Sequence, residues 1–407
     1  MTDVLSFEIR GLNGREVPLS YVMDRHVNIF FGPNGSGKTS ILKILDSAMR
    51  NEPECISNVS YQSAHVKIHS VSYSAEFLLS HTKSEEGEPT RTTSTAKLVD
   101  DVDRSMRAFV LGGGKADRWK IMPEPDSEKK EIQRWRHSYL PTSRLYMDSR
   151  LEGYLAMYRG QVPGAEAVAA EDALDRNFAT ALQSLWSTRY GDILGRVRGI
   201  QQEALQSIFL DVLMPDAETP PRRVPARTEA RVLDADRAFE RMSSFLKRQS
   251  DRRIQQALGS KAQFADRYNK DTKLRQIVNH IDVVEAQIEM EMKPIQQLSD
   301  LVRRLFLKGK SLSFEGPRIS VETESHLNLG LERLSSGEKH LLRILLAALG
   351  AEESTLLIDE PELSMHIDWQ RELVNNIRSL NPACQLILAT HSPEIMADIS
   401  DENIFRV

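Results

Sequence analysis

The chain has few cysteines and no long apolar run. Cys55 and Cys384 are its two cysteines, and neither has the paired spacing of a zinc or redox motif, so we expect both to be reduced packing residues. No stretch approaches the roughly 18 apolar residues that a membrane span needs. The first residues also lack the basic and apolar regions of a secretory leader. These absences predict a cytoplasmic protein with no membrane partner.

An excess of basic residues is also missing. The formal net charge is −5, so the chain as a whole does not attract phosphates, and any contact with nucleic acid would need local patches. The basic clusters RWRHSYLPTSR at 134–144 and PRR at 221–223 are candidates, and a solvated surface is the alternative interpretation. With 407 residues, 40% of them hydrophobic, the chain can form one large or two ordinary domains.

Apolar periodicity predicts α/β structure near both ends of the chain. Residues 26–31 are an apolar run typical of a buried strand, and residues 39–50 have apolar side chains at helical spacing. Segment 64–79 is expected to be further strand, a hairpin arm in an antiparallel β region, and 310–323 alternates as a strand pair does. We expect one head with a mixed sheet around the helix at 39–50, formed by residues 1–150 together with 309–407.

The middle of the chain, residues 151–308, is expected to be a helical insertion. The proline-rich stretch 214–227 cannot lie inside a helix. Beyond it, apolar residues from Leu274 to Leu305 recur every three or four positions, the spacing of a coiled-coil seam, and Pro294 interrupts the run. About 35 helical residues span roughly 50 Å, which predicts a short arm. A helix packed on the core of the head fits the same pattern.

The motif GPNGSGKT at 32–39 lies between the predicted strand and the predicted helix. It matches the phosphate-binding loop G-x-x-x-x-G-K-[ST], in which glycines let backbone N–H groups face an anion and the helix N-terminus adds positive charge. We expect Lys38 to reach the β- and γ-phosphates of ATP and the Thr39 hydroxyl to hold Mg²⁺. The expected nucleotide-binding residues here are Gly32, Asn34, Gly35, Ser36, Gly37, Lys38, Thr39 and Ser40.

A second apolar strand ends in two carboxylates, in STLLIDEPE at 354–362. This is the Walker B pattern. Asp359 is expected to contact Mg²⁺ through water, and Glu360 to accept a proton from the attacking water, because phosphoryl transfer depends on positioning and charge neutralisation. The alternative is a pair of solvated acids after a buried strand.

The segment RLSSGEKHLLRILLAALG at 333–350 contains Ser335, Ser336 and Gly337 at the start of an apolar-faced helix. It resembles the signature motif of ABC-type ATPases. The resemblance implies that these serines and the glycine bind the γ-phosphate of ATP held by another copy, so that two sites form when two heads meet. A helix N-terminus suits an anion, although a simple cap, Ser followed by Glu, is the other interpretation.

The segment QLILATHSPEI at 385–395 places His391 after a buried strand. It resembles the switch histidine of the same family, which contacts the γ-phosphate and the attacking water. LSMHIDW at 363–369 occupies the position of the D-loop, and His366 within it either touches the partner's site or lies on a surface turn.

Two departures from the family pattern affect details. Glu362 stands where many transporter heads have threonine, so D-loop contacts cannot be transferred. No Q-loop glutamine can be assigned. Gln62, or the segment with Thr142, Ser143 and Arg144, is the candidate.

The long interval between Lys38 and Gly337 favours the SMC, Rad and RecF branch over transporters. The sequences LSSGEKHLLRILL, LLIDEPELSMHIDWQRELV and ILATHSPEI, together with SYLPTSRLY at 138–146, are most similar to the compact ATPases of bacterial antiphage systems. These are the OLD-like proteins and the ATPase subunits of Septu, PARIS and some retrons. The resemblance covers residues 1–50 and 310–407.

The resemblance implies an α/β fold of the P-loop NTPase, ABC-head type, with ATP and Mg²⁺ as cofactors. It implies a homodimer or higher oligomer that regulates a separately encoded effector nuclease or toxin, with DNA or RNA as a further partner. Because few residues follow His391 in this sequence, we expect the effector to be a separate polypeptide and not the nuclease domain that follows the ATPase in OLD proteins. The alternatives are a RecF- or SMC-like clamp that closes on DNA upon ATP binding, and a scaffold that binds nucleotide with little turnover. GTP in place of ATP stays open.

Overall fold

A computed structural model describes the structure of the chain over most of its length, and its contacts divide it into two compact units. The first, here called the head unit, consists of residues 1–174 and 334–407, and the second, the arm unit, of residues 175–333. The described residues are 2–70, 73–83, 118–122, 135–142, 164–213, 234–248, 258–306, 310–314, 316–323 and 328–407.

The head unit contains a five-stranded parallel sheet with the order β13-β3-β12-β11-β7. Both β11 and β12 are buried along their whole length, which explains why they read as continuous apolar runs. The strands are β3 (Val27–Phe31), β7 (His137–Leu140), β11 (Thr355–Asp359), β12 (Gln385–Thr390) and β13 (Ile404–Arg406).

A second sheet of the head unit is antiparallel and has the order β2-β1-β4-β5-β6. The antiparallel β region expected at 64–79 is confirmed, and it consists of the hairpin of β4 and β5. The two sheets together give the mixed strand directions that the sequence predicts. The strands are β1 (Thr2–Arg10), β2 (Leu19–Val22), β4 (Ser63–Ser70), β5 (Ala75–Thr82) and β6 (Lys120–Met122).

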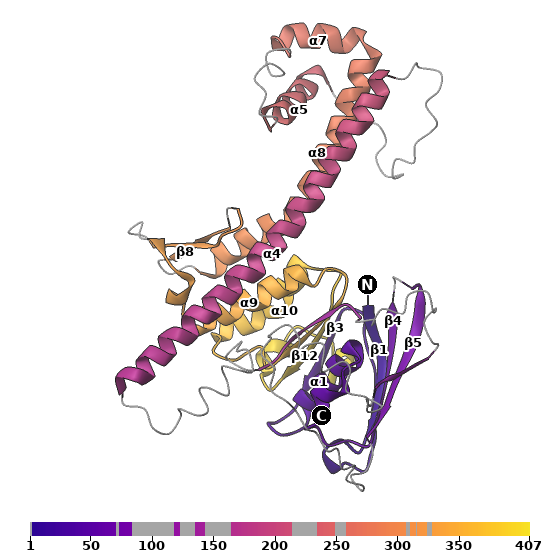
Figure 1. Ribbon diagram of the computed structural model, residues 1–407, viewed down its shortest axis with the longest axis vertical. Helices are drawn as coiled ribbons and strands as arrows, with labels where there is room; N and C mark the ends of the chain where they lie inside the picture. Colours follow the sequence, from indigo (N-terminus) through magenta and orange to yellow (C-terminus); the bar gives the residue numbers. More distant parts are fainter. Residues whose placement is uncertain are drawn as a thin grey trace, which may run out of the picture. The chain divides into compact units, whose positions relative to one another are not determined.

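Helix α1 (Lys38–Arg50) packs between the two sheets and confirms the predicted helix (Figure 1). Its apolar face joins one core cluster with side chains from both sheets, among them Phe7 of β1 and Ile387 of β12. Helices α9 (Ser336–Gly350) and α10 (Ile367–Leu380) pack against each other in the same unit. Short 3₁₀ helices in the head unit are η1 (Leu12–Gly14), η2 (Pro53–Ile56), η5 (Pro393–Met396) and η6 (Asp401–Asn403).

The carboxamide of Gln385, the first residue of β12, links the two sheets. Its oxygen accepts hydrogen bonds from the Val4 amide at 2.8 Å and the Thr355 hydroxyl at 3.0 Å. Its nitrogen donates to the carbonyl oxygens of Val4 at 2.8 Å and Asp24 at 2.9 Å. A fully buried polar side chain needs this complete pairing, because each unpaired group would carry a desolvation cost.

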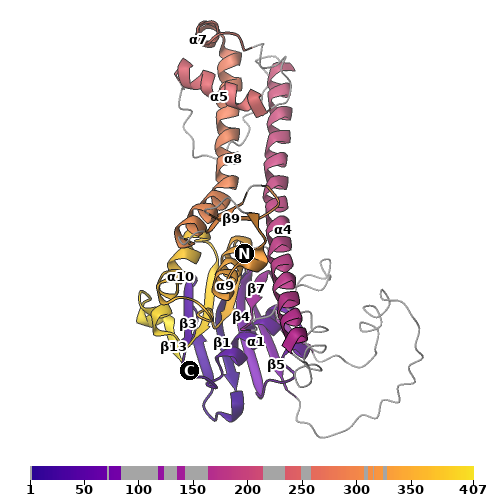
Figure 2. The same ribbon diagram turned by 90° about the vertical axis from the view of Figure 1, so that its left-hand side faces the viewer.

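The arm unit contains two long helices that run side by side, α8 (Thr272–Leu305) and the part of α4 (Gly164–Leu213) that follows residue 174 (Figure 2). Val197 and Ala204 of α4 pack on Val284 and Ile288 of α8. The predicted seam is therefore used within the arm unit, against α4. Pro294 lies inside α8 without ending it.

Two shorter helices pack on the first half of α8. These are α5 (Ala235–Arg248) and α7 (Lys261–Lys270), and the cluster that they share with α8 includes Phe245, Phe264 and Ile281. The proline-rich segment 214–227, with its PRR cluster, lies outside the described residues.

A three-stranded sheet completes the arm unit, with the order β10-β9-β8. It consists of β8 (Lys310–Ser313), β9 (Ser320–Thr323) and β10 (Asn328–Leu329), and η4 (Leu331–Arg333) follows it. The buried Trp186 of α4 donates from Nε1 to the Gly316 carbonyl at 3.0 Å, and its ring contacts Phe314 edge to face. These contacts attach the sheet to α4, so the compact unit ends at residue 333, whereas the expected boundary is at 308.

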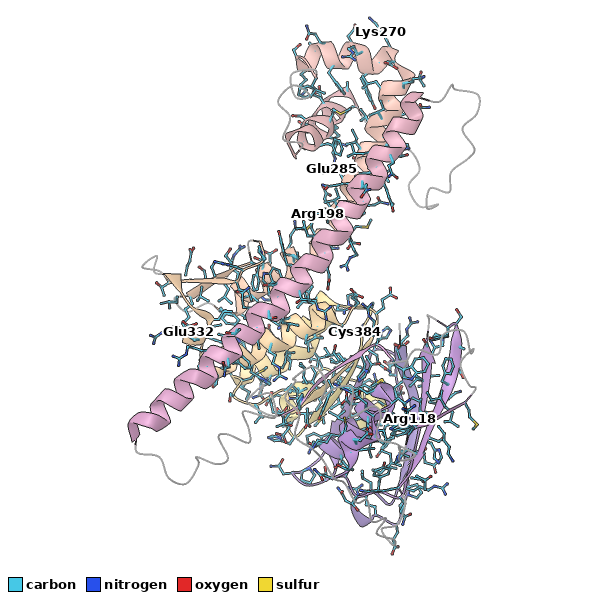
Figure 3. All side chains as sticks on the ribbon, viewed as in Figure 1. Arg118, Arg198, Lys270, Glu285, Glu332 and Cys384 are labelled. Atoms are coloured by element: carbon cyan, nitrogen blue, oxygen red, sulfur yellow. The ribbon has the colours of Figure 1, made fainter. Side chains whose placement is uncertain are left out.

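The two cysteines differ in their surroundings. Cys384 is buried as expected and lies in the head unit (Figure 3), whereas Cys55 is exposed, so the expectation of a packing residue is wrong there. Both are free thiols. Among the described helices, none combines the length and apolar character that crossing a membrane requires.

Candidate functional site

The carboxyl ends of three parallel strands lie next to one another in the head unit. Phe31, the last residue of β3, is paired with Thr390, the last residue of β12, and Asp359 at the end of β11 is paired with Ala389. The segments that follow these strands are the glycine-rich loop, the Walker B acids and the His391 loop. Open α/β sheets bind their ligands outside this edge. The three motifs, far apart in sequence, therefore meet at one edge.

The glycine-rich loop connects β3 to α1 as predicted. Gly35 and Gly37 have φ angles of 83° and 100°, which a residue with a side chain adopts only with strain. Lys38 begins α1, and its buried ammonium donates to the carbonyl oxygens of Gly32 at 2.7 Å and Pro33 at 2.9 Å. The predicted residues that this loop and the first turn of α1 bring together are Gly32, Asn34, Gly35, Ser36, Gly37, Lys38, Thr39 and Ser40.

The Thr39 hydroxyl lies against the Walker B aspartate. Its Oγ1 is 2.9 Å from Oδ2 and 3.1 Å from Oδ1 of Asp359, and the Thr142 hydroxyl also donates to Oδ2. Asp359 is almost fully buried, and this burial raises its pKa above the ordinary value, although the two hydroxyls and the lysines Lys38 and Lys43 oppose the shift. The carboxylate thus depends on donors or cations for compensation.

These residues fit a magnesium ion in their chemistry. Hydroxyl and carboxylate oxygens are hard ligands, and Mg²⁺ is commonly bound by one or two such groups together with substrate phosphates and water. No group of three or more histidine, cysteine or acidic side chains placed to hold a metal occurs among the described residues. The donor set suits an ion that arrives with a nucleotide, with Thr39 and Asp359 as the protein ligands.

Glu360 follows Asp359 and lies at the end of β11. Its backbone φ is 48°, an unusual value for a residue other than glycine, and its amide donates to the Ala389 carbonyl at 2.8 Å. The side chain is half-buried. A constrained backbone of this kind is typical of residues that the surrounding structure holds in place, and it turns the chain immediately after Asp359.

His391 lies directly after β12, beside Glu362. Its Nδ1 is 3.1 Å from Oε1 of Glu362, and its side chain is 44% exposed. The structure therefore brings His391 and Glu360 to the same sheet edge as the glycine-rich loop. Which nucleotide atoms they contact stays a prediction.

The segment of the predicted signature begins α9. Ser335 is the N-cap residue: its hydroxyl accepts from the Glu338 amide at 3.3 Å, and Glu338 accepts from the Ser335 amide at 2.6 Å. These two hydrogen bonds form a capping box, so the helix cap expected as one of the two interpretations of this segment is present. Ser336 is exposed and Gly337 is buried. A second role towards another copy stays a prediction.

Arg15 is a residue of the site that motif analysis did not identify. Its Nη2 donates to the carbonyl oxygen of Ser36 within the glycine-rich loop at 2.9 Å. The preceding segment, η1, includes Asn13 with a φ of 51°, and it packs beside Gly37. The sequence signal near Arg15 is the pair of glycines in GLNGR at 11–15. These glycines indicate a turn, but they do not indicate that the turn lies beside the glycine-rich loop.

The Q-loop candidates separate in the structure. Thr142 contacts the Walker B aspartate, whereas Gln62 lies against Gly11. Ser143 and Arg144 lie outside the described residues. His366 is the N-cap of α10, where its Nδ1 accepts from the Asp368 amide at 3.4 Å, and its side chain is exposed. Within one copy, His366 therefore lies on a surface turn. Contact with the site of a partner copy stays a prediction.

Three features define the fold of the head unit. They are the order of the parallel strands, the glycine-rich loop before α1, and the contact of Asp359 with the Thr39 hydroxyl. The head unit has the fold of a P-loop NTPase. Residues 209–397 match a family described as "AAA domain, putative AbiEii toxin, Type IV TA system". This match covers less than half of the chain and includes the signature segment, the Walker B acids and His391, but not the glycine-rich loop.

Similarity to a curated protein is short. The Retron Vc95 probable ATPase of Vibrio cholerae serotype O1 biovar El Tor is 39% identical over 49 residues. These residues make up 12% of this chain and 10% of that protein, so this chain spans only a small part of its relative's length.

The solved structures similar to this chain include SMC heads. One is the Smc head domain with an extended coiled coil, bound to the C-terminal domain of ScpA, from Pyrococcus furiosus, at 11% identity and a TM-score of 0.38, with 98% of this chain and 92% of that chain covered. Another is the SMC head domain from Thermotoga maritima, at 12% identity and a TM-score of 0.36, with 97% and 91% covered.

Proposed function

We propose that this chain hydrolyses ATP with Mg²⁺ at composite sites formed by two copies of the head unit. The observation that carries the proposal is the contact of Thr39 and Thr142 with the buried Asp359, beside Lys38 and within reach of the loops that hold Glu360 and His391. A buried carboxylate with two hydroxyl donors is costly unless a cation uses it.

Each residue has a distinct role in this proposal. Lys38 and the loop amides bind the β- and γ-phosphates, with Arg15 bracing the loop through Ser36. Thr39 and Asp359 hold Mg²⁺, which neutralises phosphate charge when bound. Glu360 accepts a proton from the attacking water. Ser335, Ser336 and Gly337 of the second copy contact the γ-phosphate, and His391 contacts that phosphate and the water.

Mixing two inactive variants tests the composite site. Lys38→Ala removes the phosphate-binding lysine, and Ser336→Arg places a bulky cation on the exposed start of α9. Each homodimer should be inactive, whereas a mixed dimer has one site with both defects and one intact site. After random exchange about a quarter of wild-type ATP turnover should return.

The control for this experiment is Glu360→Gln, alone and mixed with wild type, since it places its defect beside Lys38 in the same copy. Lys38→Ala mixed with Glu360→Gln should recover nothing, because every site then lacks one of the two residues. Full activity of Ser336→Arg alone would contradict the composite site. A wild-type rate no higher than that of Glu360→Gln, with either ATP or GTP, would favour the scaffold without turnover.

We further propose that the ATPase regulates a separately encoded effector, a nuclease or toxin, in an antiphage complex. Support comes from the family match, whose description includes a toxin–antitoxin system, and from the short similarity to a retron ATPase. The test is purification of the chain with its native flanking genes, followed by mass spectrometry and by nuclease treatment of bound nucleic acid. Phage challenge of the intact operon with Lys38→Ala is the functional control.

Recovery of a nuclease or toxin, and loss of protection in the Lys38→Ala operon, are the expected results. Unchanged protection in that variant would contradict the role in defence. The paired helices α4 and α8 are the feature that favours the second candidate, a clamp of the RecF or SMC kind. ATP-dependent, salt-sensitive binding of duplex DNA by the isolated homodimer would support the clamp.

A further inference from the structure

The carboxylate of Glu362 is buried beside the loop that follows β12. Its Oε1 accepts hydrogen bonds from the Thr390 hydroxyl at 2.7 Å and from the His391 amide at 2.8 Å, and the His391 Nδ1 lies 3.1 Å away. The Glu362 side chain is 5% exposed, whereas that of His391 is 44% exposed. One buried oxygen therefore contacts both the backbone and the ring of a half-exposed histidine.

The chemistry of these groups fixes the direction of the third contact. The Nδ1 and Oε1 atoms lie at ion-pair distance, and a carboxylate only accepts hydrogen bonds, so an Nδ1 that bonds to it carries a proton. The imidazole has two nitrogens, and in the neutral ring this arrangement leaves Nε2 as an acceptor that can take a hydrogen bond from the attacking water. Pairing with a carboxylate is also how histidines at metal and catalytic sites are held in one tautomer.

The position of Glu362 is itself determined by its loop. The Leu363 amide donates to the Glu360 carbonyl at 3.2 Å, and the Met365 amide donates to the Glu362 carbonyl at 3.0 Å, so consecutive turns connect the Walker B acids to α10. On its other side this loop is held against α9, where a β-carbon on Gly337 would lie 2.3 Å from the Ser364 carbonyl oxygen. These contacts hold the backbone of Glu362, and the Thr390 hydroxyl and the His391 amide hold its carboxylate.

We propose that Glu362 is a positioning residue that holds the His391 imidazole in its Nδ1-protonated tautomer, with Nε2 directed to the reacting groups. The inference rests on the proposed ATPase function for its kinetic consequence, but the tautomer is a property of the protein without nucleotide. The position that carries threonine in many transporter heads therefore supplies a carboxylate partner for the histidine in this chain.

Glu362→Gln is the most informative substitution, because it keeps the size of the side chain. Among the described residues nothing donates to or accepts from Oε2 of Glu362, which is buried. If the glutamine oxygen keeps the Thr390 and His391 contacts, its NH₂ group takes the buried position of Oε2, where no hydrogen-bond acceptor is available in the part of the chain that the structure describes. If the amide turns round, its NH₂ group faces the Nδ1 proton. Either outcome weakens the hold on the ring.

The first measurement is ¹⁵N NMR of histidine-labelled protein, with the His391 signals assigned by their loss in His391→Ala. Wild type should show His391 protonated at Nδ1, and Glu362→Gln should show a mixture of tautomers. Glu353→Gln, an exposed acid before β11, is the matched control and should leave the signals unchanged. A wild-type histidine protonated only at Nε2, or tautomers unaffected by Glu362→Gln, would overturn the proposal.

The second measurement is a double-mutant cycle on ATP turnover. Glu362→Gln should lower kcat by about tenfold or more with little change in KM, because positioning affects the reaction more than ground-state binding. It should have no further effect in a His391→Ala background, whereas a general folding defect would add to it. Additive losses would overturn the inference. If wild type lacks turnover altogether, the proposed function fails, and the NMR result still decides the inference about Glu362.

Discussion

The Cα of Gly337 faces the carbonyl oxygen of Ser364 so closely that a β-carbon would lie 2.3 Å from that oxygen. Gly337 belongs to the predicted signature segment on α9, and Ser364 to the D-loop segment between β11 and α10. The contact joins two segments that lie apart in the sequence. It also explains why this position in the signature needs glycine, apart from any contact with nucleotide.

Gly337→Ala should therefore destabilise the head unit and lower ATP turnover, because the start of α9 must move away from the D-loop. The expected loss is about 1–3 kcal/mol in the free energy of unfolding, the usual range for overpacking. Gly191→Ala in α4 is the matched control, since no atom lies within 4 Å of the added carbon, and it should stabilise the protein slightly. Chemical denaturation measures both. A stability of Gly337→Ala equal to that of wild type would refute the close contact.

Asp359→Asn should abolish the stabilisation that Mg²⁺ and ATP give to the folded protein. In the absence of nucleotide its melting temperature should not fall below that of wild type, because the pKa of Asp359 is raised by burial. A raised acid pKa means that the native state binds more protons than the unfolded state above pH 3.8, so the charge is a cost at neutral pH. Thermal shift with and without Mg²⁺ and ATP tests this, with the exposed Asp368→Asn as control.

His340 of α9 predicts a pH dependence of stability. Burial, with a smaller effect of Arg343, lowers its pKa to about 4 from 6.5. Below pH 6.5 the unfolded state gains a proton that the native state resists, so stability falls as pH decreases from 6.5 to 4. The full effect is about 3 kcal/mol.

His340→Gln should flatten the stability profile over this pH interval. Urea denaturation at several pH values measures it, and His366→Gln at an exposed position is the comparison. An unchanged slope between pH 4 and 6.5 would show that His340 does not titrate in this way.

Gln385→Leu should be among the most damaging conservative changes in the core. It leaves the Val4 amide and the carbonyl oxygens of Val4 and Asp24 without these partners. The expected loss is about 3 kcal/mol or more in the free energy of unfolding. Leu386→Met in the same strand conserves volume and should cost less than about 1.5 kcal/mol. Similar losses for the two variants would mean that the carboxamide is not the link between the sheets.

Thiol labelling should separate the two cysteines. Exposed Cys55 should react with an aromatic disulfide reagent in the native protein. Cys384 should react only on unfolding, because it is buried and its pKa is raised by burial to about 11, which leaves little thiolate. Cys55→Ser should remove the native reaction. Two fast-reacting thiols in wild type would contradict the burial of Cys384.

Much of the local structure could be predicted from the sequence. The glycine-rich loop with its flanking strand and helix, the β4–β5 hairpin, the buried strand β11 and the apolar seam of α8 all follow from short-range periodicity and turn chemistry. These signals lie within single segments, where side-chain spacing reports directly on the buried face.

Contacts between distant segments could not be predicted in this way. The bond from Arg15 to Ser36, the approach of Thr142 to Asp359 and the pairing of Glu362 with His391 each depend on how separate loops meet. The attachment of β8–β10 to α4 through Trp186 also depends on distant segments, and it places the end of the arm unit at residue 333 and not at the expected 308.

The sequence by itself predicted the glycine-rich loop and the acids at a strand end that are candidates for binding phosphate and metal, because loop chemistry and strand ends are encoded locally. Only the tertiary structure decided which of them share a site, and it did so through the order of the parallel strands, which brings the ends of β3, β11 and β12 to one edge. It also decided that Glu362, an unremarkable departure in the motif, lies buried against His391. Burial and partner are properties of packing, and no local pattern carries them.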